Sequence, residues 1–98
     1  MRLSDFEIKS IVESITSLDS NAQVYLYGSR VDDNKKGGDI DLLAVSQSLK
    51  YSDKIDILIS IKDKIGDQKI DLKIATEKEL REDPFLNEIF PQAIVLNN

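Results

Sequence analysis

The chain has 98 residues, a net charge of −5, and neither cysteine nor histidine. These counts exclude disulfides, thiolate chemistry and histidine-dependent nucleophiles, and they argue against a zinc site. The length fits a single domain over residues 1–98, and the 41% apolar and 32% charged content suits a globular protein rather than a disordered one. The negative charge argues against broad binding to a nucleic-acid backbone. No apolar run is long enough to cross a bilayer and the first residues lack a signal-peptide pattern, so we expect a cytoplasmic protein.

The first predicted element is a helix near the start of the chain. Ser4 and Glu7 have the form of a capping box, which marks a helix N-terminus. Apolar residues follow at helical spacing, at Ile8, Ile11, Val12, Ile15 and Leu18. We expect the helix to end at residues 19–21 and to lead into a strand over residues 22–27.

A second strand is predicted over residues 38–45, after a polar loop of turn composition. Such a loop favours antiparallel pairing of the two strands. Residues two apart on a strand share a face, so Asp39 and Asp41 would project side by side. Paired carboxylates stay ionised only with a cation between them, and hard oxygen ligands suit Mg²⁺ best. A calcium loop starting at Asp32 is excluded, because Lys36 occupies one of its ligand positions.

The next predicted element is a helix over residues 49–65, followed by a strand over residues 70–75. The helix carries an apolar stripe made of Ile55, Leu58, Ile59 and Ile65, which Ile57 and Ile61 broaden. As a crossover connection, this helix would make the strand that follows it parallel to the second strand. Asp71 and Lys73 would share one face of that strand.

Short helices are expected in the last quarter of the chain. Thr76 opens a second capping box, and Pro84 starts a further turn of helix. Residues 93–96 form either a final short strand or a docked tail.

The pattern of motifs resembles a known family. Gly28-Ser29, then Asp39-Ile40-Asp41, with a later acid at Asp71, is similar to the signature of the polymerase-β-like nucleotidyltransferases, particularly their smallest members, the minimal nucleotidyltransferase (MNT) family. The resemblance covers nearly the whole chain. It implies an α/β (α+β) fold with a small mixed sheet and helices packed on one side.

The resemblance also implies a chemistry for the three aspartates. Asp39, Asp41 and Asp71 would hold Mg²⁺, two ions in the family mechanism, during transfer of a nucleotide from ATP. Asp71 would in addition activate the acceptor hydroxyl or take its proton as a general base.

The glycine-serine turn is implied to bind the triphosphate. Gly28 would let the backbone approach a phosphate, and Ser29 and Arg30 would contact the phosphate oxygens. Lys35 and Lys36 would either add positive charge to this site or form a solvated loop tip.

The sequence departs from the family pattern around the same turn. Asp32 and Asp33 stand where many members carry an arginine and a glycine, and Gly38 replaces a common serine. The loop is also about one residue short, while all three carboxylates are intact.

The resemblance implies a partner as well. Small members of this family are often paired with a HEPN-type helical protein encoded nearby, in toxin–antitoxin systems in which AMP is transferred to a tyrosine of the HEPN protein. The implied function is therefore that of an adenylyltransferase antitoxin. Two alternatives stay open: a binding module that inhibits a HEPN partner by contact alone, and a transfer subunit for a small-molecule hydroxyl.

Overall fold

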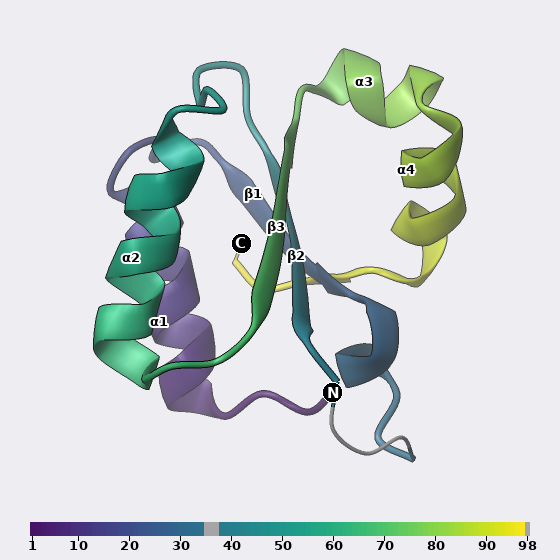
Figure 1. Cartoon of the computed structure of the whole chain (residues 1–98). Helices are drawn as coiled ribbons and strands as arrows, with labels where there is room; N and C mark the ends of the chain where they lie inside the picture. Colours follow the sequence, from purple (N-terminus) through teal and green to yellow (C-terminus); the bar gives the residue numbers. More distant parts are fainter. Residues whose placement is uncertain (35–37, 98) are drawn as a thin grey trace.

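The computed structural model describes residues 1–34 and 38–97 (Figure 1). Its elements are α1 (Asp5–Thr16), β1 (Gln23–Tyr27), the 3-10 turn η1 (Gly28–Val31), β2 (Ile40–Val45), α2 (Asp53–Ile65), β3 (Ile70–Ala75), α3 (Glu77–Glu82), α4 (Pro84–Ile89), the 3-10 turn η2 (Phe90–Gln92) and β4 (Ile94–Val95). Within the described residues, no helix combines the length and apolar character needed to cross a membrane.

The strands form one mixed sheet in the order β3-β2-β1-β4. β1 is antiparallel to β2 and to β4, whereas β2 and β3 are parallel. The predicted hairpin and the predicted crossover through α2 are therefore both confirmed. Residues 93–96 were predicted to form either a short strand or a docked tail. They contain the short strand β4, which lies at the edge of the sheet next to β1.

The two long helices, α1 and α2, lie side by side against one face of the sheet (Figure 1). Between them and the sheet is the main core, whose largest fully buried side chains are Ile11, Ile15, Val24, Leu26, Ile40, Leu42, Ile57, Ile61 and Leu72. Burying each such side chain contributes about 1.5–3 kcal/mol to folding. This core holds β1, β2 and β3 in place.

The two short helices, α3 and α4, lie on the opposite side of the sheet (Figure 1). They cover a smaller apolar cluster, formed by Tyr27, Leu43, Val45, Ala75 and Leu86. The prediction that helices pack on one side thus describes α1 and α2, while α3 and α4 cover part of the other face. That partial cover leaves the rest of the second face open.

Both predicted capping boxes are formed, at the starts of α1 and α3. The Ser4 hydroxyl accepts a hydrogen bond from the Glu7 amide, and the Glu7 carboxylate accepts one from the Ser4 amide. Thr76 forms the same reciprocal pair at the start of α3. The predicted C-terminal extent of the first helix was too long, because α1 ends at Thr16 and Leu18 is exposed.

The apolar stripe predicted for α2 was also partly wrong. Its fully buried residues are Ile57 and Ile61, whereas Ile55 and Ile59 are 63% and 54% exposed. The helix itself begins at Asp53, later than predicted. Because α2 carries isoleucine or leucine on several sides, its contacts with α1 and the sheet decide which of them are buried.

Candidate functional site

The turn that follows β1 lies directly against a carboxylate of β2. Gly28 has a φ of +78°, in the left-handed region that favours glycine. A Cβ atom on Gly28 would lie 2.2 Å from Asp41 Oδ2. Glycine is therefore required here both by the backbone conformation and by the approach of the turn to Asp41.

A second glycine fits the hairpin around the Ser29 side chain. Gly38 has a φ of +90°, and a Cβ at this position would lie 2.2 Å from Ser29 Oγ. The Ser29 hydroxyl thus lies beside the residue that precedes Asp39, as the predicted antiparallel hairpin requires. The φ of +90° favours glycine at this position.

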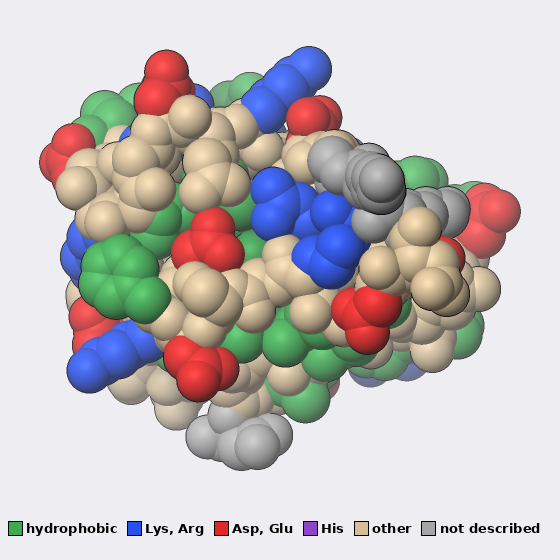
Figure 2. Space-filling model, turned by 90° about the horizontal axis from the view of Figure 1, so that it is seen from below, with side chains coloured by type: hydrophobic (Ala, Val, Ile, Leu, Met, Phe, Trp, Pro, Cys, Tyr) green, Lys and Arg blue, Asp and Glu red, His purple; other side chains and the backbone are tan. Residues whose placement is uncertain are grey.

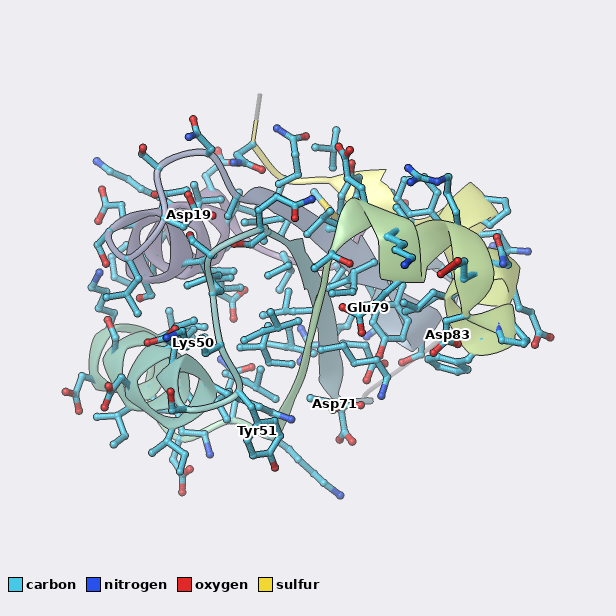
Figure 3. All side chains as sticks on the ribbon, turned by 90° about the horizontal axis from the view of Figure 1, so that it is seen from above. Asp19, Lys50, Tyr51, Asp71, Glu79 and Asp83 are labelled. Atoms are coloured by element: carbon cyan, nitrogen blue, oxygen red, sulfur yellow. The ribbon has the colours of Figure 1, made fainter. Side chains whose placement is uncertain are left out.

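The aspartates come from the starts of two neighbouring parallel strands. Asp41 on β2 is the direct register partner of Asp71 on β3, so their side chains leave the same face of the sheet. Viewed from above, Asp71 lies on the side of β3 that faces α3 and α4 (Figure 3). Asp39 precedes β2, and its Oδ2 lies 3.8 Å from Lys69 Nζ in an exposed ion pair.

These carboxylates influence one another electrostatically. Burial, together with the neighbouring carboxylates of Asp71 and Asp39, raises the pKa of the Asp41 carboxyl, and the Lys73 ammonium opposes this shift. Burial and the carboxylates of Asp71 and Asp41 also raise the pKa of Tyr27 to about 12, so its phenol stays protonated at neutral pH. The negative charge of Asp41 is therefore disfavoured by its surroundings, and a nearby cation would stabilise it.

The donor chemistry of this site fits a hard divalent cation. Its available ligands are carboxylate oxygens, and a cation beside Asp41 would offset the repulsion from Asp71 and Asp39. Within residues 1–34 and 38–97, no group of three or more Asp, Glu, His or Cys is already gathered as a metal-binding cluster. The three aspartates are thus neighbours with the right chemistry, and not a closed set of ligands.

Arg30, predicted to contact phosphate, uses its guanidinium for contacts within the protein. Nη1 donates to the carbonyl of Arg2 at 2.9 Å, Nε donates to the carbonyl of Gly38 at 3.3 Å, and Nη2 donates to Gln68 Oε1 at 3.5 Å. Contact with a phosphate stays a prediction for this residue. Lys35 and Lys36 lie outside the described residues.

Two cavities lie on the side of the sheet that α3 and α4 partly cover, and Phe85 of α4 lines both. One, of about 540 Å³, is lined by Gly28 and Ser29 together with residues of α4 and η2. The other, of about 430 Å³, is lined by Lys73, residues of α3 and the loop before α2. Both volumes lie in the range of small-molecule sites. A ligand of nucleotide size therefore has room beside the turn.

Two polar residues of this region were not assigned a role from the sequence. Tyr27 is the register partner of Asp41 on β1, and the Lys73 ammonium lies 5.1 Å from the centroid of the Phe85 ring. Strand alternation already places Lys73 on the face of Asp71, so a signal for it existed. The position of Tyr27 beside Asp41 depends on the hairpin register, which the sequence does not state.

A match to a known family covers most of the chain. A model described as a nucleotidyltransferase domain matches residues 8–96, a stretch that includes the Gly28-Ser29 turn and all three aspartates. No curated protein matches the chain.

Proposed function

Because the chain belongs to the nucleotidyltransferase domain family, we propose that it transfers AMP from ATP, with Mg²⁺, to a hydroxyl group of a HEPN-type partner protein. Nucleotidyl transfer in general follows from membership of the family. The observation that carries the proposal is the pairing of Asp41 with Asp71 across β2 and β3, with Gly28 in contact with the Asp41 carboxylate.

The turn is suited to the phosphates of the nucleotide. Without a Cβ, Gly28 leaves the backbone accessible from the side of the cavity of about 540 Å³ that it lines with Ser29. Ser29 offers a hydroxyl group and a backbone amide as donors to phosphate oxygens. The turn would thereby hold the triphosphate with its reactive end beside Asp41.

The aspartates have distinct roles in the proposal. Asp39 and Asp41 would hold Mg²⁺, which supplies positive charge against the α-phosphate and the departing pyrophosphate. Asp71 is exposed on the edge strand β3, where an acceptor can approach it. It would accept the proton of the acceptor hydroxyl as that oxygen bonds to the α-phosphorus and pyrophosphate leaves.

The choice of donor and acceptor is supported by the resemblance of the motifs to the minimal nucleotidyltransferases. In this proposal AMP is the transferred group, and the acceptor is a tyrosine of the HEPN-type partner. This chain would be the antitoxin, and the partner its target. Added AMP would silence that partner.

Asp71→Asn tests the proposal. Its amide cannot take a proton, so we expect transfer to fall by about a hundredfold or more while nucleotide is still bound through Asp39 and Asp41. The measurement is the mass of the partner after incubation with ATP and Mg²⁺, where each added AMP is visible. Asp63→Asn, an exposed change on α2, is the matched control and should transfer like the wild type.

A contact-only inhibitor gives a different result in the same assay. The partner's mass would stay unchanged with the wild-type protein, although the partner would still be silenced. That outcome would refute transfer to this partner. Equal transfer by Asp71→Asn and the wild type would instead remove the proposed role of Asp71.

A further inference from the structure

We propose that Arg2 and Arg30 form an arginine clasp, a pair of positioning residues that sets the Gly28-Ser29 turn relative to Asp39 and Asp71. Both side chains are half-buried at the end of the molecule where the turn lies. In Figure 2, which views this end, basic side chains gather near the centre with acidic side chains around them. The inference rests on the proposed function for its effect on nucleotide binding.

Arg2 joins the N-terminal segment to the backbone of the turn. Its amide donates to the Arg30 carbonyl at 2.7 Å. Its guanidinium donates through Nη2 to the Ser29 carbonyl at 3.0 Å and through Nε to the Asp32 carbonyl at 3.1 Å. The same side chain thus holds both ends of η1, including the peptide unit that follows Ser29.

Arg30 completes the clasp and extends it. Its Nη1 returns a hydrogen bond to the Arg2 carbonyl at 2.9 Å, so each arginine holds the backbone of the other. Its Nε reaches the carbonyl of Gly38, the neighbour of Asp39, and its Nη2 reaches Gln68, on the segment that leads to Asp71. One guanidinium therefore connects the three segments that carry the proposed site residues.

Gln68 links the clasp to the first helix. Its Nε2 donates to Glu7 Oε2 at 2.9 Å, and Glu7 is the acid of the capping box that begins α1. These hydrogen bonds outweigh the effect of burial and lower the pKa of Glu7, with Arg30 contributing through its charge. The clasp is thus connected to the start of α1.

The chemistry of the contacts requires arginine. Most acceptors are backbone carbonyls in different directions, which the planar guanidinium with its fixed donors can serve at once. Lysine has a single ammonium and cannot reproduce that geometry. Among the described residues, neither guanidinium forms an ion pair with a carboxylate, so both positive charges remain beside the turn.

Loss of the clasp should act on nucleotide binding first. Without the Arg2 side chain, the Asp32 carbonyl loses its guanidinium donor and the Ser29 carbonyl keeps only the Asp32 amide, at 3.2 Å. The turn therefore loses two of the hydrogen bonds that position it. Misplacement of a binding group by about 1 Å can cost about a hundredfold in kcat/KM. Arg2 itself makes no hydrogen bond to Asp39, Asp41 or Asp71. The loss of its side chain should therefore raise KM for ATP more than it lowers kcat.

The experiment compares Arg2→Ala, Arg2→Lys and the control Arg81→Ala. Arg81 lies exposed on α3, and its removal changes the net charge by the same amount. We expect Arg2→Ala to raise both KM for ATP and the Kd of a non-hydrolysable ATP analogue with Mg²⁺ by about tenfold to a hundredfold. Arg2→Lys should recover part of this loss, and Arg81→Ala should match the wild type.

A second readout follows the turn itself. Amide hydrogen exchange of residues 29–32 should accelerate in Arg2→Ala and stay unchanged in Arg81→Ala. If Arg2→Ala only lowers Tm, and binds the analogue like the wild type well below its unfolding transition, the positioning role is refuted. If Arg2→Ala does not fold, Arg2→Lys decides the question, since unchanged analogue affinity in that variant would refute the role equally.

The two proposals fail in distinguishable ways. A wild type that binds the analogue in an Arg2-dependent manner but adds no AMP to the partner would refute the proposed function and leave the clasp standing. A wild type that transfers AMP, with analogue binding independent of Arg2, would refute the clasp alone. A wild type that binds no analogue would overturn both.

Discussion

The two faces of the sheet are built from the same strands and differ sharply in composition. Toward α1 and α2, β1, β2 and β3 present only apolar side chains, and the largest of these are fully buried. Toward α3 and α4, the strands are apolar at one end, at Leu43, Val45 and Ala75, and carry Asp41 and Asp71 at the other. Alternation along each strand produces both faces at once.

The difference shows how this small fold separates stability from chemistry. The face covered by α1 and α2 has no charged group to desolvate, so its burial stabilises the fold without the cost of removing a charge from water. The short helices leave the carboxylates at the open end of the second face, where a charge can be solvated or bind a cation. The parallel pairing of β2 with β3 holds Asp41 and Asp71 in register.

The largest expected effect on function comes from Asp41→Asn. Removing this carboxylate takes away a proposed Mg²⁺ ligand and the contact partner of Gly28, so transfer should fall by about a hundredfold to a thousandfold. The fold should not suffer, because burial and two neighbouring carboxylates disfavour the charge of Asp41 in the metal-free protein. Transfer is measured by the mass of the partner, and stability by Tm in the presence of EDTA.

The matched control for this variant is Asp56→Asn, an exposed change on α2. It should leave transfer and Tm near the wild-type values. A marked drop in Tm for Asp41→Asn without metal would show that the carboxylate is needed for folding. In that case the separation between the two faces would not hold.

A second prediction compares adjacent residues of β2 that face opposite ways. Leu42→Ala opens a cavity among α1, α2 and the sheet, so we expect a loss of about 3–5 kcal/mol in the free energy of unfolding. Leu43→Ala opens a cavity under α3 and α4, which are short and can move to fill it, and should cost about 2–3 kcal/mol. Chemical denaturation of both variants measures the difference, and an equal or larger loss for Leu43→Ala would contradict it.

Much of the fold was predictable because its signals are local. Capping boxes mark the starts of α1 and α3, at Ser4 and Thr76. The polar loop indicates the antiparallel pairing of β1 with β2, and the length of the segment that contains α2 indicates the parallel pairing of β2 with β3. These two pairings make the sheet a mixed one. The pairing of Asp41 with Asp71 follows from that topology once the register is known.

Other features depend on contacts between distant segments and leave no pattern in the sequence. Arg2 gives no sign that it binds the carbonyls of Ser29 and Asp32, and nothing around Gly28 indicates that a Cβ would meet Asp41. The prediction of which side of α2 is buried was partly wrong for a related reason. A helix with isoleucine on several sides has more than one apolar stripe, and only its packing partners select between them.

The smallest expected effect tests that orientation directly. Ile59 is 54% exposed on the outer side of α2, so Ile59→Ser should change the free energy of unfolding by no more than about 0.5 kcal/mol. Ile61→Ser, on the same helix, places a hydroxyl and a cavity in the core and should cost more than about 3 kcal/mol. Serine and isoleucine have similar helix propensities, so the contrast isolates burial. Comparable losses for the two variants would mean that Ile59 is covered in solution, and the outer side of α2 would then belong to an interface.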